Sequence, residues 1–390
     1  MINKPLKSIL KDDLDQLIVN QVVEGKAIEY KLEFPTNMEN SKGPILAGIS
    51  AFANTIGGDL IFGIGARNGI PENLVGFDNA VRDNEILRLE SSIRSGIEPR
   101  LVNYTFHSVD IGENKFVLVL RINKSWIGPH MITYNGSNKF YGRSSVGKYP
   151  LDVSEIRRSI LLSEMAPNRA RSFREERVFK IAANDTYVKL PNFGKYIVHL
   201  IPQQSISSDY SLDIKTIIDQ QNRPRPEGLD NSHFKINLDG MLLHQTSEAD
   251  DNYAYLQWFR NGIIEYVFCN EPRNGIKYVF SVSFEEVIFK SIRNCLNQMK
   301  SIGLDVPVYI YLSMMGFKGY LMGAEDIRRG TYSQKTNDEN ILVQEKEIED
   351  YSLDISKEMR SVFDVVWNAF GYKQSYNYNT EGNWAAFNRV

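Results

Sequence analysis

The stretch from Glu24 to Ala66 decides the fold, and it holds three segments: EGKAIEYKLEF (24–34), ILAGISAFANTIGG (45–58) and DLIFGIGA (59–66). The first segment alternates apolar and polar residues over 28–34, which predicts a half-buried β-strand. The second places its apolar residues at helical spacing and ends in two glycines, which tolerate the left-handed turn that closes a helix. The third indicates a buried strand. The order strand, helix, strand predicts a mixed α/β domain.

Charged side chains gather at the start of this stretch. On a strand over 28–34, Glu29, Lys31 and Glu33 would share one face, because successive side chains alternate between the two faces of a strand. Glu24 precedes the strand, where a turn would bring it back beside Glu29. The sequence therefore predicts a site in which two carboxylates and a lysine lie next to one another.

The ordered motifs of this stretch resemble the AlbA-like DNA-binding domain of the Schlafen family. The residues that support the resemblance are the E-x4-E-x-K run at Glu24, Glu29 and Lys31, the AFANTIGG segment (51–58) and the FGIG strand end (62–65). The resemblance covers residues 12–162. It implies an α+β domain with mostly hairpin-linked strands that binds RNA, such as tRNA-like RNA, or DNA.

In catalytically active relatives, the resemblance implies three carboxylates that hold a divalent metal for cutting tRNA or other structured RNA. Oxygen ligands suit hard cations such as Mg²⁺ or Mn²⁺, and the metal can stabilise charge on a transferring phosphoryl group. The resemblance makes Glu24 and Glu29 catalytic metal ligands, and it makes Lys31 a catalytic contact to phosphate. Antiviral defence or translation control is the setting that it implies.

The third family carboxylate aligns without gaps to Ala66, and an alanine cannot ligate a metal. Glu33, on the same face as Glu29, or Asp78, in a later loop, would have to complete the site instead. Without a third ligand, Glu24 and Glu29 are a pair of solvated or lysine-bridged carboxylates. Activity as a metal-dependent endoribonuclease therefore depends on a ligand that the sequence does not identify.

A basic stretch lies between residues 121 and 158, with seven basic and two acidic side chains. Aromatic residues are interleaved with the basic ones, and this combination suits a phosphate backbone with stacked bases. The alternative is a solvated face whose aromatic residues belong to the core. The predicted nucleic-acid contacts are Arg121, Lys124, Lys139, Arg143, Lys148, Arg157 and Arg158.

One motif in the basic stretch is similar to a phosphate-binding loop, since residues 142–148 match GxxxxGK. Such a loop also needs Ser or Thr after the lysine, and a helix whose amides hold the phosphate. Tyr149 and Pro150 follow Lys148 instead. The sequence therefore argues against a nucleotide-binding ATPase.

The composition is that of a globular chain long enough for two or three domains, with 390 residues of which 42% are hydrophobic and 24% charged. No apolar run reaches the roughly 18 residues that a membrane-spanning helix needs, and residues 1–16 lack the apolar core of a signal peptide. The two cysteines, Cys269 and Cys295, form no metal-binding pattern. We therefore expect a cytoplasmic protein with no membrane association.

The sequence pattern divides the chain into two lobes. Residues 1–163 form the predicted Schlafen-like domain, residues 164–180 are rich in charge and predict a charged linker, and residues 181–390 predict a second α+β domain. Residues 1–180 hold 24 basic and 21 acidic side chains (+3), and residues 181–390 hold 45−24=21 and 48−21=27 (−6). We expect the second lobe to sense a ligand or to bind a partner, either another protein or a second copy in a homo-oligomer.

Two functions follow from these patterns. The first is a Schlafen-like nucleic-acid-binding protein that cuts tRNA-like RNA as a metal-dependent endoribonuclease, and the intact Glu24, Glu29 and Lys31 favour it. The second is a non-catalytic, DNA-binding transcriptional regulator with a ligand- or partner-sensing second domain. Ala66 favours this alternative, because it removes a metal ligand.

Overall fold

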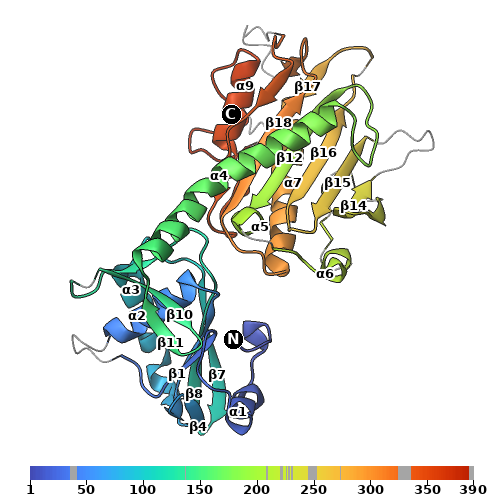
Figure 1. The fold of residues 1–390 in the computed structure, drawn as a ribbon. Helices are drawn as coiled ribbons and strands as arrows, with labels where there is room; N and C mark the ends of the chain where they lie inside the picture. The colour runs from blue at the N-terminus through green and yellow to red at the C-terminus, as the bar shows by residue number, and fades with distance from the viewer. Residues whose placement is uncertain are drawn as a thin grey trace. The chain divides into compact units, whose positions relative to one another are not determined.

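The computed structural model describes residues 1–35, 42–136, 138–207, 210–219, 223–224, 226, 229, 232–244, 253–272, 274–323 and 335–385. The chain separates into two compact units, Met1–Glu164 and Met165–Val390 (Figure 1). Both units combine helices with sheets, as the predicted α+β class requires.

The first unit is built on a mixed sheet in which β2 and β8 are central. β1 runs parallel to β2, and the other neighbouring strands pair antiparallel. β7 and β8, which are consecutive in the chain, form the predicted hairpin. The strand order is β1-β2-β8-β5, and β7 also pairs with β8. The strands are β1 (Ile28–Lys31), β2 (Gly58–Phe62), β5 (Phe77–Asp78), β7 (Tyr104–Gly112) and β8 (Lys115–Ile122).

Smaller sheets and helices complete the first unit. One sheet has the order β11-β10-β9-β6, and β3 pairs with β4 in a separate hairpin. These strands are β3 (Ile64–Arg67), β4 (Ile70–Leu74), β6 (Ile97–Glu98), β9 (Met131–Ile132), β10 (Lys139–Ser144) and β11 (Gly147–Pro150). The helices are η1 (Leu6–Ser8), α1 (Lys11–Val19), α2 (Lys42–Asn54), η2 (Asn79–Val81) and α3 (Arg82–Gly96).

Both faces of the central sheet in the first unit are covered. One hydrophobic cluster joins α2 and α3 to one face of β2 and β8, and a second cluster joins α1 to the opposite face. The sequence predicted a half-buried strand over 28–34. That prediction is wrong in two respects, because β1 ends at Lys31 and its residues Ile28, Glu29 and Tyr30 are all buried.

Helix α4 (Val153–Ala182) begins in the first unit and continues into the second. It includes residues 164–180, for which the sequence predicts a charged linker. From Ala166 onward it buries Ala170, Arg174, Arg177 and Ile181.

The second unit contains an antiparallel sheet with the order β13-β14-β15-β16-β12-β18-β20, and β21 also pairs with β18. Figure 1 shows α4 crossing the strands β12, β16 and β18. The strands are β12 (Gly194–Pro202), β13 (His233–Ile236), β14 (Gly240–His244), β15 (Ala254–Phe259), β16 (Ile264–Asn270), β18 (Val308–Met315), β20 (Asn340–Leu342) and β21 (Lys346–Ile348).

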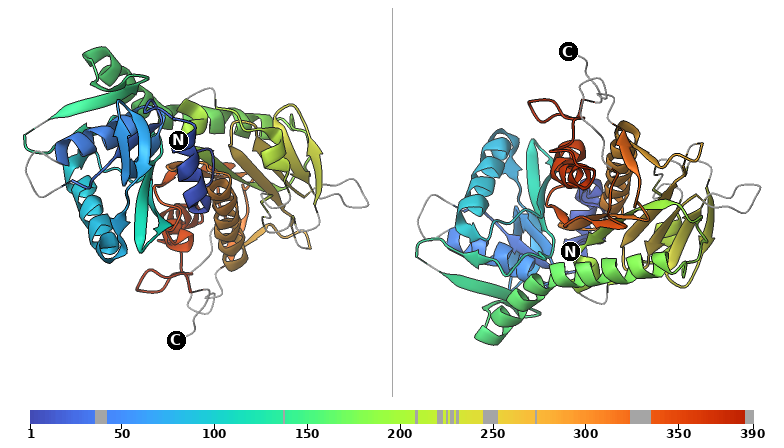
Figure 2. Two further views of the ribbon diagram at one scale, coloured as in Figure 1. Left: turned by 90° about the horizontal axis from the view of Figure 1, so that it is seen from below. Right: turned by 90° about the horizontal axis from the view of Figure 1, so that it is seen from above.

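The two faces of this sheet carry different helices. The large core lies between one face and α7 (Ser281–Ser301), α8 (Ile355–Glu358) and α9 (Arg360–Ala369). The opposite face is covered by α4, as the views in Figure 2 show. The remaining elements are α5 (Gln203–Ser207), α6 (Ile214–Ile218) and the parallel pair β17 (Tyr278–Phe280) and β19 (Leu321–Gly323).

No helix in the described parts of the chain has the length and apolar character needed to cross a membrane.

Candidate functional site

Glu29 is the centre of the candidate site in the first unit. It lies on β1 and is only 6% exposed. Its Oε1 forms an ion pair with Lys31 Nζ at 2.6 Å, and its Oε2 forms one with Arg143 Nη1. Two cations from different strands therefore share one carboxylate.

Arg143 is fixed by the first unit on several sides. Its Nε donates to the Gly25 carbonyl at 2.6 Å, and its guanidinium lies 4.2 Å from the centre of the Phe52 ring. Its backbone N–H donates to the Thr55 hydroxyl at 3.0 Å. At 4% exposure, Arg143 is positioned to neutralise Glu29 and contributes little to the surface.

Glu24 returns to the strand as the sequence predicted. Its Oε1 accepts a hydrogen bond from the Tyr30 backbone N–H at 2.7 Å, while its own backbone N–H donates to the Gly69 carbonyl at 2.8 Å. Gly69 lies in the turn between β3 and β4 with φ of +75°, a backbone conformation that glycine adopts without strain. This turn holds Glu24 at the edge of β1.

Lys148 on β11 completes the group. Its Nζ donates to the Pro44 carbonyl at 2.7 Å. Burial lowers the pKa of Lys148, and Glu29 and Glu24 oppose this shift while Lys31 and Arg143 add to it. Glu24, Glu29, Lys31 and Arg143 are thus each close enough to the Lys148 ammonium to influence its pKa. We call Glu24, Glu29, Lys31, Arg143 and Lys148 the charged cluster.

Helix α2 packs directly against the charged cluster because of a glycine. A Cβ added to Gly48 would lie 3.3 Å from Glu29 Oε2, which is tighter than ordinary contact. The small residue therefore lets the helix backbone approach the carboxylate. The AFANTIGG motif that follows in the sequence is the second half of this helix and the turn into β2.

The charge state of Glu29 follows from its surroundings. Burial by itself would raise the pKa of Glu29, but Lys31 and Arg143 together lower it below the ordinary value. The carboxylate is therefore ionised at neutral pH, and both of its oxygens face cations.

The residues present do not fit a metal centre of three carboxylates. Within the described residues, no three acidic, histidine or cysteine side chains gather in a group that could hold a metal ion. Ala66 lies exposed on β3 and offers no ligand. Glu33 is exposed, and Asp78 is engaged as the cap of η2, where it accepts from the Ala80 N–H at 2.8 Å.

Among the predicted nucleic-acid contacts, Arg121 is also occupied within the unit. Its Nε and Nη2 donate to the two oxygens of the buried Asp59 at 2.7 and 2.9 Å. Its Nη1 and Nη2 also donate to the carbonyls of Lys4 and Ile2. Arg121 thus ties the amino-terminal segment to β2 and β8.

The other predicted contacts divide by exposure. Lys124 lies over the Trp126 ring at 4.2 Å, and burial lowers its pKa. Lys139, Arg157 and Arg158 are exposed, on β10 and on α4. The structure therefore gathers Arg143 and Lys148 into the charged cluster but leaves these four outside it.

The GxxxxGK motif is a β-hairpin. β10 and β11 pair antiparallel, with Ser144 opposite Gly147 and Arg143 opposite Lys148. No helix starts at Lys148, so the amides that would hold a phosphate in a phosphate-binding loop are absent from this hairpin. The hairpin instead brings Arg143 to Glu29 and Lys148 to the Pro44 carbonyl.

Sequence reasoning missed the pairing of Glu29 with Arg143, because 114 residues separate them. The only signal was that an arginine stands in an otherwise apolar and small-residue strand segment, YGRSS. Arginine is mostly exposed in proteins and is rarely buried unless it is paired, so the sequence alone favoured an exposed side chain.

Residues 24–152, which are 129 of the 390 residues, match the family model described as Schlafen, AlbA_2. Several solved structures resemble parts of the chain, and they include the following two. One is the amino-terminal domain of a Nitrosomonas europaea protein described as related to the ATP-dependent DNA helicase RecG, at 24% identity over 35% of this chain and 88% of that chain, with a TM-score of 0.27. The other is the DIP2311 protein from Corynebacterium diphtheriae, at 17% identity over 40% of this chain and 29% of that chain, with a TM-score of 0.26.

No curated protein matches the chain. The family match includes all five residues of the charged cluster, since they fall between residues 24 and 148. Residues 24–152 of the amino-terminal unit therefore match the Schlafen AlbA_2 domain, over a third of the chain.

Proposed function

We propose that the Schlafen AlbA_2 domain binds nucleic acid by holding a backbone phosphate at the charged cluster, without a divalent metal. The observation that supports this most is the double neutralisation of Glu29 by Lys31 and Arg143. A carboxylate whose two oxygens already face cations has little remaining capacity for a metal ion.

The charge balance of the cluster supports the same proposal. Lys31, Arg143 and Lys148 contribute three positive charges, while Glu24 and Glu29 contribute two negative ones. A third carboxylate at position 66 would make the sum zero, and a bound metal would then be needed to attract phosphate. With Ala66, the cluster has a net charge of +1 and can attract a phosphate directly.

Lys31 is the residue best placed to make the contact. Its side chain is 30% exposed, whereas those of Glu29 and Arg143 are 7% and 3% exposed. The buried pair of Glu29 and Arg143 thus orients the Lys31 side chain through its ion pair with Glu29. Exposed Lys139, Arg157 and Arg158 would extend the contact to neighbouring phosphates.

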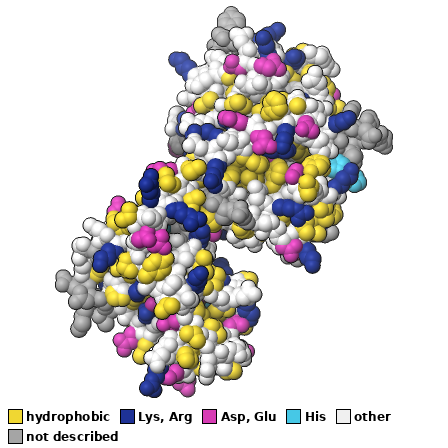
Figure 3. All heavy atoms as spheres, viewed as in Figure 1, with side chains coloured by type: hydrophobic (Ala, Val, Ile, Leu, Met, Phe, Trp, Pro, Cys, Tyr) yellow, Lys and Arg dark blue, Asp and Glu magenta, His cyan; other side chains and the backbone are white. Residues whose placement is uncertain are grey.

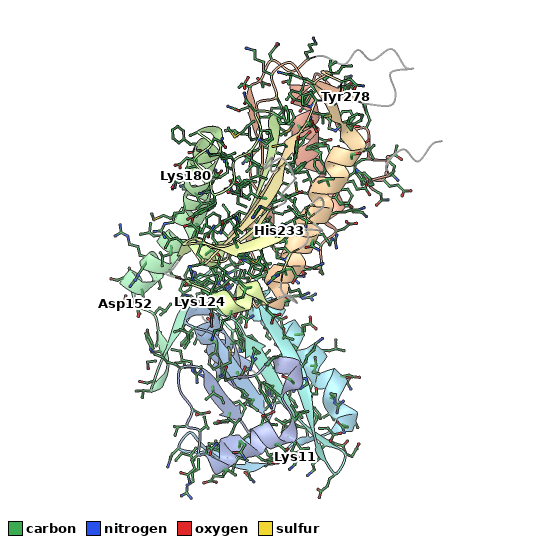
Figure 4. The ribbon with its side chains drawn as sticks, turned by 90° about the vertical axis from the view of Figure 1, so that its right-hand side faces the viewer. Lys11, Lys124, Asp152, Lys180, His233 and Tyr278 are labelled. Carbon is green, nitrogen blue, oxygen red and sulfur yellow. The ribbon has the colours of Figure 1, made fainter. Side chains whose placement is uncertain are left out.

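The test is equilibrium binding of fluorescent single-stranded RNA, tRNA-like hairpin RNA and duplex DNA to the full chain, with EDTA present. Lys31→Gln should weaken binding about tenfold and reduce the salt slope by nearly one phosphate contact. Lys11→Gln is the matched control, since Lys11 lies on α1 outside the charged cluster. Figure 4 shows Lys11 and Lys124 at opposite ends of the first unit.

Loss of binding in EDTA would contradict the metal-free proposal. Equal affinities of the Lys31→Gln and Lys11→Gln variants would contradict the role of the cluster. The ranking of the three nucleic acids shows which of them the domain prefers, and so separates an RNA-directed protein from a DNA-binding regulator.

The metal-dependent endoribonuclease is the second candidate, and the adjacent Glu24, Glu29 and Lys31 favour it. It requires a metal, Mg²⁺ or Mn²⁺, held by two protein carboxylates with water and substrate phosphates as the other ligands. Incubation of tRNA with the protein and Mn²⁺ tests it. Cleavage that stops with EDTA and with Glu29→Gln would establish this candidate, and intact tRNA would exclude it.

A further inference from the structure

Helix α4 turns three arginines toward the sheet of the second unit, at spacings of three residues. Two of them meet carboxylates there. Arg171 Nε donates to Glu345 Oε2 at 3.1 Å, and Arg177 donates to both oxygens of Glu265 at 2.8 Å. Each of these cations therefore has its own anion.

Arg174, the middle arginine, has no such partner. It is 7% exposed, and its Nε and Nη1 lack a hydrogen-bond acceptor in the described part of the chain. Its Nη2 pairs only loosely with Glu175, at 4.0 Å, and that carboxylate side chain is 64% exposed. The guanidinium lies 5.2 Å from the centre of the Tyr311 ring.

The sheet beneath Arg174 adds two more groups without partners. Tyr311 on β18 and His199 on β12 are directly opposite in the register, and both are fully buried. Within the described residues, the Tyr311 hydroxyl and His199 Nδ1 have no hydrogen-bond partner. The other ring nitrogen of His199, Nε2, is already engaged by Glu265 at 3.0 Å.

The energetic consequence is an unbalanced charge. Removing a guanidinium from water costs several kcal/mol unless a counter-charge and hydrogen bonds replace the solvent. Arg171 and Arg177 are each paired with a close carboxylate, whereas the pair of Arg174 with the exposed Glu175 is long, at 4.0 Å. A close counter-charge is therefore missing at Arg174, where two nitrogens of the guanidinium and the Tyr311 hydroxyl have no hydrogen-bond partner in the described part of the chain.

We infer that Arg174 and Tyr311 form a binding site for one small anion between α4 and the sheet. The anion would accept hydrogen bonds from Arg174 Nε and Nη1 and from the Tyr311 hydroxyl. The site lies in the second unit, so it is independent of the function proposed for the first unit. Chloride and inorganic phosphate share the required chemistry, and the experiment distinguishes them.

The test is calorimetric unfolding of the full chain in a zwitterionic buffer, with ionic strength kept constant by a bulky organic sulfonate. Chloride and phosphate are each titrated against this background. An anion that binds only the folded state raises the Tm saturably, by about 5 °C or more at one hundred times its Kd. Ordinary water in the site would leave the Tm independent of the anion and would overturn the inference.

Substitutions then assign the response to Arg174. Arg174→Met should abolish the rise in Tm, and without the anion it should be at least as stable as the wild type, because an uncompensated buried charge is gone. Arg171→Met, which removes a neighbouring arginine with its own carboxylate, should retain the response. An Arg174→Met protein that still responds would refute the site.

A milder variant covers the case in which Arg174→Met does not fold. Tyr311→Phe removes one hydroxyl and should weaken binding of the anion about tenfold. The midpoint of the titration then shifts, and the rise in Tm is retained. An unchanged midpoint would contradict the inference. Because the charged cluster of the first unit could also bind phosphate, Lys31→Gln serves as the control that should retain the part of the response that Arg174→Met removes.

Discussion

Glu29 and Arg143 show how a buried charge is tolerated at the level of one residue. The pair is nearly inaccessible to solvent, and every polar atom of the carboxylate faces a cation. A pair of this kind contributes less to net stability than its geometry suggests, because both charges were desolvated on folding. Substitution of only one of the two residues, however, leaves the charge of the other buried and uncompensated.

We therefore expect Arg143→Met to lower the free energy of unfolding by about 3 kcal/mol, since Glu29 would keep only Lys31 as a partner. Glu29→Gln should cost a similar amount by leaving Arg143 unpaired. The double variant should recover part of the loss, because neither buried charge of the pair is then left without its partner. Urea unfolding of the three variants measures this coupling, and strictly additive losses would contradict it.

Glu265 gives the second prediction at this scale. Burial would raise the pKa of Glu265, but hydrogen bonds from Arg177 and His199 lower it to about 2. An unfolded glutamate titrates near 4.3, so the stabilisation is present above about pH 4.3 and is lost as the pH falls toward 2. A shift of that size corresponds to about 3 kcal/mol.

Acid unfolding monitored by calorimetry between pH 5 and about 2 checks this dependence. The wild type should lose the stability steeply in this window, and Glu265→Gln should start less stable and lose less of it. Parallel curves for the two proteins would show that Glu265 does not contribute to the acid transition.

At the scale of elements, the contact between α2 and β2 sets the position of the charged cluster. Gly58, the second glycine of the AFANTIGG motif, places its backbone against the Phe52 ring. A Cβ there would lie 2.1 Å from Phe52 Cε1 and 3.0 Å from the Ala27 carbonyl oxygen. The motif therefore needs this glycine for close packing, in addition to the turn that the sequence predicts at Gly57.

Gly58→Ala should accordingly destabilise the first unit by at least 2 kcal/mol, since the ring or the strand must move. Gly43→Ala on α2 is the control, because its added Cβ meets only Tyr134 Cδ1 at 3.9 Å. Alanine favours helix, so this control should be neutral or slightly stabilising. Thermal unfolding compares them, and equal Tm values would refute the packing argument.

Most elements could be predicted from periodicity, and the exceptions have physical causes. The helix over α2 and the hairpin of β7 and β8 follow from local patterns that tertiary contacts reinforce. β1 alternates like a half-buried strand, yet Glu29 is buried because Arg143 neutralises it from 114 residues away. Local patterns record the polarity of a residue and carry no information on a distant partner.

At the scale of the whole molecule, the charge difference between the lobes depends on where α4 is counted. Residues 1–164 hold 19 basic and 19 acidic side chains, so residues 165–390 hold 45−19=26 and 48−19=29. The +3 of residues 1–180 therefore comes from α4 residues that belong to the second unit. Figure 3 agrees, since basic and acidic side chains are interspersed over the surface it shows.

This balance predicts how the full chain meets nucleic acid. A first unit with no net charge cannot attract a polyanion over long distance, so binding must depend on the few cations at and near the charged cluster. The logarithm of the affinity should then fall with the logarithm of salt concentration at a slope of about −2 to −3, as for three or four phosphate contacts. Photo-crosslinking of bound RNA, followed by mass spectrometry, should label peptides within residues 1–164. Crosslinks confined to residues 165–390, or a slope of about −5 to −6 as for the whole basic stretch, would show that the binding surface lies elsewhere or is much larger than the cluster.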